Sequence, residues 1–199
     1  MENQLLIRFA KISDASSLLS IYEPYVRQTS FTPESKVPFV QTFREKIKEA
    51  DSIYPFLVGS FNGQIVGYAY AHQYRQASGH QWSVETTIYC SPEFQGKGIA
   101  GALYRTLLEI LKIQGFINVF AGIILPNDKS VTFHKRFNFT QVGVFEKGIL
   151  KAGIWHDVLW MQSALKDHTK NPPLPLTLPE IVNTVSFKNI MNKIHNRAN

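Results

Sequence analysis

The chain has 199 residues, 44% of them hydrophobic and 13% aromatic, enough for one sizeable core and too few for two ordinary domains. Its net charge of +6 forms no basic stripe and no interleaved aromatic pattern, which argues against a nucleic-acid-binding protein. The apolar runs are too short to span a membrane, no signal peptide is evident and Cys90 is the only cysteine, so we expect a cytoplasmic protein without a membrane partner or an internal disulfide.

The hydrophobic periodicity predicts one sheet with helices on both faces. Asn62-Gly63 joins two apolar strands as a hairpin, and the strand–helix–strand order of residues 81–124 requires a parallel crossover. We therefore expect an α/β (α+β) fold with a single mixed, mostly antiparallel sheet. In chain order, the expected elements are a strand at 5–10, helices at about 13–24 and 38–47, strands at 55–61, 64–74 and 81–90, a helix from 99 to Gly115, a strand at 117–124, a short helix at about 128–136, and strands at about 139–147 and 153–164.

The composition changes at Lys166. Four prolines in residues 172–179 exclude a continuous helix or an interior strand there. The segment that follows predicts a short amphipathic helix, and its apolar residues are Ile181, Val185, Ile190 and Ile194. We expect one domain over residues 1–165 and a proline-rich linker with an amphipathic tail over 166–199. The tail can dock on the body, pair with another subunit or stay mobile, and the sequence leaves these alternatives open.

Gly96, Gly98 and Gly101 surround the expected start of the helix at residue 99. Glycine costs a helix about 1 kcal/mol relative to alanine, so its use here needs a reason. The start of a helix presents unpaired N–H groups and partial positive charge to an anion, and glycine lets the anion approach the backbone. The spacing fits neither a dinucleotide-binding fingerprint nor a P-loop. An anion-binding loop and a merely tight turn both remain possible.

Three segments resemble the GNAT superfamily of N-acetyltransferases. The string QGKGIA at residues 95–100 is similar to the acyl-CoA loop, Gln/Arg-x-x-Gly-x-Gly/Ala. Residues 127–139 resemble the segment N-x-x-A/S…Y/H-x-x-x-G-F, with Asn138 in place of the usual glycine. Asparagine is the next-best residue in the left-handed conformation, so we expect the turn to be kept. Residues 153–162 look like the terminal strand of the phosphinothricin and methionine sulfoximine acetyltransferases, and the resemblance covers residues 5–165.

The resemblance implies an N-acetyltransferase that uses acetyl-CoA as its co-substrate and needs no metal. The loop amides would hold the CoA pyrophosphate, with Lys97 either adding charge or simply solvated. The end of the preceding strand would lie along the pantetheine and the acetyl group. Asn127 would bond the pantetheine, a role compatible with capping the short helix. The expected cofactor-binding residues are Ile88, Tyr89, Cys90, Gln95, Gly96, Lys97, Gly98, Ile99, Ala100, Gly101 and Asn127.

Transfer to an amine requires a proton acceptor and a proton donor. Glu85 stands in the middle of a strand that should be central, where carboxylates are rare, and at the position of the substrate-contacting glutamate of the similar enzymes. We expect it to take the proton of the amine; the alternative is a surface salt-bridge partner. His134 can protonate the leaving thiolate, since its ordinary pKa lies about 2 units below that of a thiol; the alternative is a histidine without a catalytic role. We expect Cys90 to be a small core residue because the family transfers the acetyl group directly.

The polar loop at residues 74–82 is the expected substrate contact, and Arg75 can grip a carboxylate bidentately. Trp155 lies in a late strand that approaches this loop, so it can either contact the substrate or pack in the core, and we favour core packing. We predict an N-acetyltransferase for a small amino-acid-like amine, such as phosphinothricin, methionine sulfoximine or methionine sulfone, and a homodimer. The alternative is a CoA-binding or partner-binding protein on the same scaffold without turnover. The expected substrate-binding residues are Arg75, Gln76, Ala77, Glu85, Thr86 and Thr87.

Overall fold

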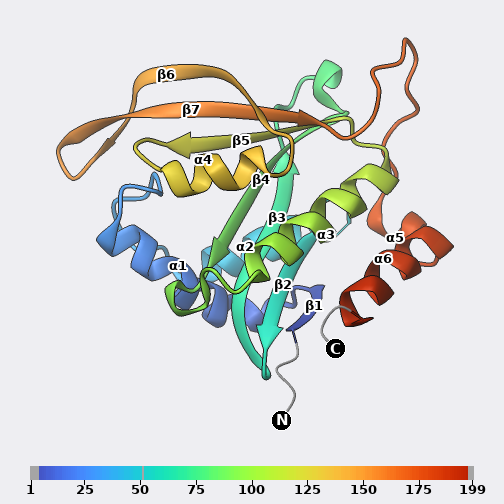
Figure 1. The fold of residues 1–199 in the computed structure, drawn as a ribbon, viewed down its shortest axis with the longest axis horizontal. Coiled ribbons are helices and arrows are strands. Elements are labelled where there is room, and N and C mark those ends of the chain that lie inside the picture. The colour runs from blue at the N-terminus through green and yellow to red at the C-terminus, as the bar shows by residue number, and fades with distance from the viewer. Residues whose placement is uncertain (1–4, 51, 197–199) are drawn as a thin grey trace.

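Seven strands form one sheet in the order β1-β2-β3-β4-β5-β7-β6 (Figure 1). The computed structural model describes residues 5–50 and 52–196, with side chains of the last helix described as far as residue 192. Only β4 and β5 are parallel neighbours, which confirms the mixed, mostly antiparallel sheet. The strands are β1 (Leu5–Phe9), β2 (Phe56–Phe61), β3 (Gln64–Gln73), β4 (Ser83–Cys90), β5 (Asn118–Ile124), β6 (Thr140–Lys151) and β7 (Ile154–Ala164). The helices are α1 (Ala15–Gln28), α2 (Val40–Ala50), α3 (Ile99–Gln114), α4 (Asp128–Lys135), α5 (Leu178–Ile181) and α6 (Val185–Asn196).

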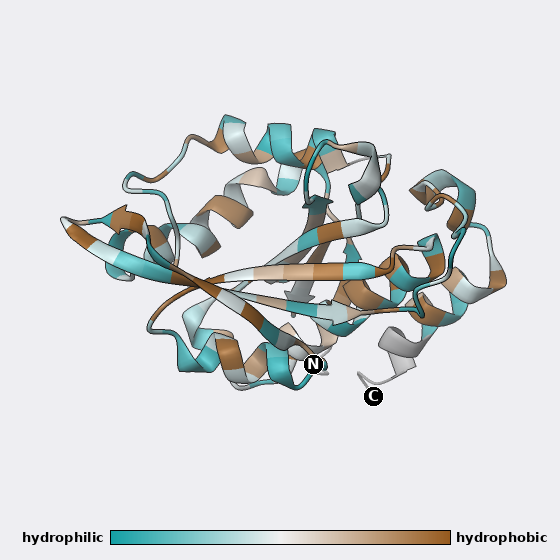
Figure 2. Cartoon of the chain, turned by 90° about the horizontal axis from the view of Figure 1, so that it is seen from above, coloured by the Kyte–Doolittle hydropathy of each residue, from teal (hydrophilic) through white to brown (hydrophobic). Residues whose placement is uncertain are grey.

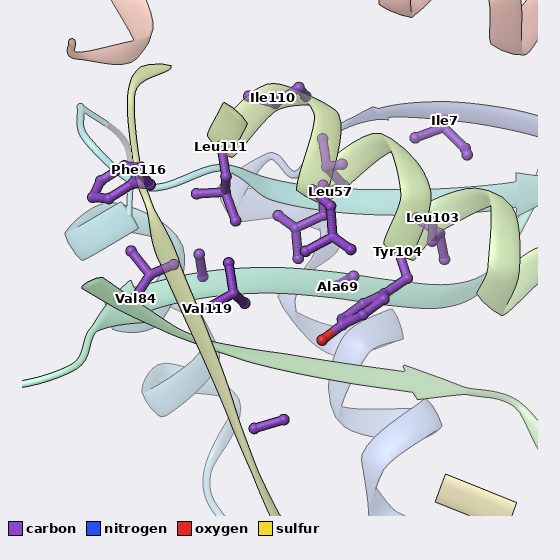
Figure 3. Close-up of a cluster of buried hydrophobic side chains, with 14 of the residues drawn as sticks. Ile7, Leu57, Ala69, Val84, Leu103, Tyr104, Ile110, Leu111, Phe116 and Val119 are labelled. Carbon is purple, nitrogen blue, oxygen red and sulfur yellow. The ribbon is translucent and has the colours of Figure 1, made fainter. Parts of the chain in front are cut away.

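Two clusters of buried side chains lie on the two faces of the sheet. On one face, Leu103, Tyr104 and Leu111 of α3 point toward the strands, where they meet residues such as Leu57 and Val84 (Figure 3). On the other face, residues of α1 and α2 pack against β2 and β3. The expected helices on both faces are therefore confirmed, with α3 as the main helix on the first face.

Local backbone signals are confirmed at the turns. Asn62 and Gly63 both have positive φ, as a hairpin of this type requires, and Gly115 ends α3 with a φ of 104°. Asn138 has a φ of 62°, so it occupies the left-handed position expected of it. Several boundaries differ from the expectation. α1 continues through Pro24 to Gln28, with Val26 buried in its last turns, α2 ends at Ala50 and β6 ends at Lys151.

The sheet opens between its two parallel strands. β4 and β5 pair only from Ser83 with Asn118 to Glu85 with Phe120. Beyond Glu85, β4 stays with β3 as far as Cys90, whereas β5 stays with β7. The two strands therefore separate toward their carboxyl ends and leave a gap in the sheet that begins at Glu85.

The C-terminal tail docks on the body, which resolves the alternatives left open by the sequence. Leu178, Ile181, Phe187 and Ile190 are buried in the same cluster as α3. The expected single helix is wrong, because the segment forms α5 and α6, and Val185 is 73% exposed. The side chain of Ile194 lies outside the described residues. The division of the chain at residue 165 stays a prediction.

Hydrogen bonds also fasten the tail. The buried amide Nε2 of Gln114, at the end of α3, donates to the carbonyl oxygens of Ile53 at 2.7 Å and Leu176 at 2.9 Å. The indole N–H of Trp82 donates to the carbonyl oxygen of Pro173 at 2.7 Å. The proline-rich segment is therefore bonded to the end of α3 and to the start of the fourth strand.

Truncation of Ile181 tests whether the tail belongs to the core. Ile181 is 1% exposed, so Ile181→Ala should lower the free energy of unfolding by about 2–5 kcal/mol, through lost burial and a residual cavity. Val185→Ala, a matched change on an exposed residue of the same tail, should stay within about 0.5 kcal/mol. Urea denaturation of both variants measures the difference. Equal, small effects would mean that the tail is not part of the core.

Candidate active site

Two cavities meet at the gap between β4 and β5. The first, of about 300 Å³, lies beside α4 and is called the α4 cavity. The second, of about 260 Å³, is bounded by residues of α1, α2 and β3 and is called the α2 cavity. Phe31, Glu85, Thr87 and Tyr89 line both. A group in one cavity is thus next to a group in the other, with Glu85 at the junction.

The structure brings many of the predicted site residues together in the α4 cavity. Four of the expected cofactor-binding residues, Gly96, Lys97, Gly98 and Gly101, form the loop before α3 and the start of that helix and are not part of this lining. Ile99 is also absent because it is 2% exposed and packs in the core. The predicted residues that do line the cavity are Glu85, Thr86, Thr87, Ile88, Tyr89, Cys90, Gln95, Ala100, Asn127 and His134.

The glycine loop is open rather than crowded. Gly96 and Gly98 have φ values of +78° and +80°, a conformation that favours glycine, and a Cβ at either would meet nothing within 4 Å. Gly101 has ordinary helical backbone, and a Cβ there would also meet nothing within 4 Å. A tight turn explains the first two glycines, but neither strain nor packing explains Gly101. Open access to the start of α3 accounts for all three.

The end of β4 is fixed by a tyrosine that sequence reasoning missed. The hydroxyl of Tyr25 in α1 donates to the carbonyl oxygen of Cys90 at 2.5 Å and accepts from Nε2 of Gln95 at 3.0 Å. These bonds join α1 to both the strand end and the loop. In the sequence Tyr25 follows Pro24, just beyond the expected end of the helix, and no local signal sets it apart.

Burial keeps the Cys90 thiol protonated. The side chain is 6% exposed, and desolvation raises the pKa of the thiol to about 11. A thiolate is the nucleophilic form of cysteine, so this environment suits the expected role as a small core residue.

His134 is more deeply buried than its expected role required. Its ring is 4% exposed and makes edge contacts with Tyr104 and Phe139. Nδ1 lies 2.8 Å from the carbonyl oxygen of Ser130, an acceptor, so Nδ1 carries the hydrogen and Nε2 is the acceptor in the neutral ring. Burial lowers the pKa of His134, and the bond to Ser130 offsets this only in part. The imidazole is therefore mainly neutral at pH 7.

The neighbouring Asn127 caps α4. Its side-chain oxygen accepts a hydrogen bond from the backbone N–H of Ser130 at 3.1 Å, the usual role of an N-cap asparagine. The same residue lines the α4 cavity, so capping and exposure to a ligand are combined as the sequence suggested.

Glu85 is a half-buried carboxylate at the junction of the cavities. Desolvation raises its pKa, and the nearby His72 on β3 offsets this only in part. Within the described residues Glu85 forms no ion pair, which speaks against a surface salt-bridge role. Its neighbour Thr86 points to the opposite face, where its hydroxyl lies 2.8 Å from that of Tyr104. Thr86 therefore links β4 to α3.

The predicted substrate loop lies apart from both cavities. Arg75, Gln76 and Ala77 are exposed and do not belong to the lining of either one. The guanidinium of Arg75 lies over the ring of Tyr74 at 5.1 Å. Their part in substrate binding stays a prediction. Trp155 is 58% exposed, so the expectation that it packs in the core is wrong.

The α2 cavity contains charged residues that no sequence motif predicted. Glu34, in the segment between α1 and α2, accepts a hydrogen bond from the hydroxyl of Tyr22. Lys46 of α2 also lines this cavity. The segment that carries Glu34 is fastened by Lys151 of β6, whose Nζ donates to the carbonyl and hydroxyl oxygens of Thr32, each at 2.9 Å. These contacts join distant parts of the chain, so local sequence patterns do not reveal them.

Two further features are absent from the part of the chain that the structure describes. No group of three or more histidine, cysteine, aspartate or glutamate side chains there is arranged to hold a metal ion. None of its helices has both the length and the apolar character needed to cross a bilayer.

Comparisons with known proteins agree with this geometry. Residues 7–160 match the family model described as the acetyltransferase (GNAT) domain. The chain is 32% identical over 174 residues to the phosphinothricin N-acetyltransferase of Streptomyces viridochromogenes, covering 86% of this chain and 94% of that protein. It is 30% identical over 166 residues to the L-methionine sulfoximine/L-methionine sulfone acetyltransferase of Salmonella typhimurium, covering 82% and 96%. The crystal structure of a GNAT superfamily phosphinothricin acetyltransferase from Sinorhizobium meliloti, in complex with acetyl-CoA, matches with a TM-score of 0.78 at 29% identity, covering 89% of this chain and 97% of that chain.

The buried state of His134 predicts its titration. In an NMR titration, with the resonance assigned by comparison with His134→Gln, the imidazole should titrate below its ordinary value of 6.5. As the pH falls through the unfolded pKa, the unfolded chain binds the proton first, so this group lowers stability below about pH 6.5. His134→Gln should lack that part of the decline. A pKa at or above 6.5 would contradict the burial argument.

Proposed function

The chain belongs to the GNAT family of acetyltransferases, and on this basis we propose that it transfers the acetyl group of acetyl-CoA directly to the α-amine of a small amino-acid-like substrate. The observation that carries the proposal is Glu85, a half-buried carboxylate where the α4 and α2 cavities meet. Acetyl-CoA supplies an activated acyl group, and the α4 cavity would receive its acetyl end. The amine would enter from the α2 cavity and meet the acetyl group beside Glu85.

The loop before α3 is the proposed site for the CoA pyrophosphate. The backbone N–H groups from Gly96 to Gly101 begin a helix, and the space above them is open, which suits an anion. Lys97 adds a positive charge to the same loop. The separated end of β4, from Ile88 to Cys90, would lie along the pantetheine arm, with Asn127 on the other side of the cavity. The similar Sinorhizobium meliloti enzyme was crystallised with acetyl-CoA, which supports this assignment.

The proposed chemistry moves two protons away from the amine nitrogen. An amine near pH 7 is mostly an ammonium ion and cannot attack, so Glu85 first takes one proton. The nitrogen then bonds to the acetyl carbon, the carbon–sulfur bond breaks, and the nitrogen gives up a second proton. That proton must reach the sulfur. His134, neutral with Nε2 as an acceptor, is suited to take the proton and pass it on, which modifies the role expected of a charged donor.

The surroundings of Glu85 and of the end of β4 favour the proposed chemistry. Burial raises the pKa of Glu85, so its proton affinity comes closer to that of the amine than the affinity of an exposed carboxylate would. A backbone N–H near Tyr89 or Cys90, at the separated end of β4, is the simplest donor for the carbonyl oxygen of the acetyl group.

A CoA-binding or partner-binding protein without turnover is the alternative. It would need the open loop and the α4 cavity but no carboxylate at the junction of the two cavities. A half-buried carboxylate with no ion-pair partner in the described residues costs folding free energy, and a catalytic role accounts for its presence, which favours the enzyme. The relatives named as acetyltransferases support the same choice.

A homodimer remains part of the proposal. β6 and β7 form a hairpin that projects from the body, with hydrophobic segments along it (Figures 1 and 2). A second copy of the chain would cover this apolar surface, and sedimentation equilibrium measures whether a dimer forms. The exposed large apolar side chains of the hairpin are Val142, Val144, Phe145, Leu150, Ile154 and Trp155.

A cytoplasmic location likewise stays a prediction.

Substitution of Gly98 tests the CoA site. Acetyl-CoA and CoA should both stabilise the protein, by about 2.7 kcal/mol at 100 times the dissociation constant, because the phosphates bind the backbone regardless of the acetyl group. Gly98→Val should abolish this shift in thermal denaturation. Gly153→Val is the matched control: Gly153 has a φ of +78° and open space around it but lies in the β6–β7 turn. A normal ligand shift in folded Gly98→Val would exclude the loop as the phosphate site.

Substitution of Glu85 tests the proton acceptor. Glu85→Gln should lose most activity at neutral pH and bind CoA normally, with partial recovery at higher pH, where free amine exists without help. In the wild type, activity should fall on acidification as Glu85 becomes protonated, above its ordinary value of 4.5 because its pKa is raised. Glu146→Gln, an exposed carboxylate on β6, should leave the profile unchanged. An unchanged profile in Glu85→Gln would place the base elsewhere.

A further inference from the structure

The α2 cavity has an uneven set of charges. Glu85 and Glu34 contribute two carboxylates, and Lys46 contributes the single cationic side chain in the described lining. The carboxylate of Glu34 is already bonded to the hydroxyl of Tyr22, whereas Glu85 stands at the junction with the α4 cavity. A ligand with one positive and one negative group would complement Glu85 and Lys46 together.

Aromatic rings hold the ammonium of Lys46 in place. Its ammonium lies 5.7 Å from the ring centroid of Phe43 and 6.0 Å from that of Tyr70, within the range of cation–π attraction. Within the described residues it forms no ion pair. The residue is half-buried, and the aromatic rings restrict where the ammonium can lie. A positioned cation without a carboxylate partner is what an anionic ligand group requires.

Arg75, the carboxylate partner expected from the sequence, lies elsewhere. It is exposed, rests over Tyr74 and is not part of the lining of the α2 cavity. We propose instead that Lys46 binds the α-carboxylate of the acceptor amino acid while Glu85 receives the α-amine. This assignment rests on the proposed acetyl transfer and adds the residue that would make the enzyme select an amino acid over a simple amine.

The rest of the α2 cavity fits an uncharged side chain. Aromatic residues such as Phe31, Tyr70 and Trp160 form much of its wall. Apart from Glu34, Lys46 and Glu85, the described lining carries no charged side chain. The cavity therefore suits a zwitterion whose side chain is neutral.

Two acceptors that differ only in the carboxylate test the role of Lys46. Methionine sulfone and 3-(methylsulfonyl)propan-1-amine share the side chain and the amine, but only the first has an α-carboxylate. Lys46→Met keeps the apolar stem and removes the charge. It should raise KM for methionine sulfone by about 10- to 100-fold and change KM for the other amine by less than about threefold. KM for acetyl-CoA should not change, and Lys46→Arg should restore most of the loss.

Two further variants complete the test. Lys48→Met removes an exposed cation of the same helix and should leave both acceptors unaffected. Arg75→Ala should likewise preserve the preference for methionine sulfone. Equal losses on both acceptors in Lys46→Met, or a selective loss in Arg75→Ala alone, would overturn the assignment of Lys46 and leave acetyl transfer standing. If the wild type acetylates no amine, the proposed function falls, and the role of Lys46 falls with it.

Discussion

The short parallel pairing of β4 with β5 determines the rest of the site. Strands that paired along their whole length would leave no gap, and the two faces of the sheet would be separated by continuous backbone. Here the pairing ends at Glu85 and Phe120, and the carboxyl ends of the strands move apart. Each strand keeps its outer neighbour, so the gap is rigid on both sides. A carboxylate at that point can face a ligand from either side of the sheet.

Burial acts in opposite directions on the two proposed proton carriers, and both shifts favour the neutral form. It raises the pKa of Glu85 and lowers that of His134. A carboxylate and an imidazole differ by about two pKa units in water, and the site narrows this gap. Closer proton affinities make it easier for both groups to exchange protons with an amine and a thiol without a deep energetic trap at either one.

Turns, helices and strands that depend on neighbouring residues could be predicted from the sequence. Contacts between residues far apart in the chain could not. Asn62-Gly63, Gly98 and Asn138 have backbone conformations that local chemistry requires, and the elements around them were predicted well. The contact of Tyr25 with Cys90 spans 65 residues and follows no motif. Lys46 looks like a solvated residue of an amphipathic helix until β3 brings Tyr70 beside it. The amphipathic pattern of the tail was visible in the sequence, but its docking against α3 was not, because that depends on contacts with a distant helix.

The two hydrogen bonds from Lys151 to Thr32 have a consequence for the assembled protein. Lys151 ends β6, and Thr32 sits between Phe31 and Pro33, which form part of the wall of the α2 cavity. The hairpin also lines that cavity directly through Ile149, Val158 and Trp160, and Lys151 joins it to the segment that carries Phe31 and Pro33. Any contact that shifts the hairpin, including the proposed pairing with a second copy, therefore acts on the shape of the cavity. If the protein dimerises in this way, its affinity for the acceptor amine depends on protein concentration. The affinity of the loop before α3 for CoA does not, because that loop has no such link to the hairpin in the described residues.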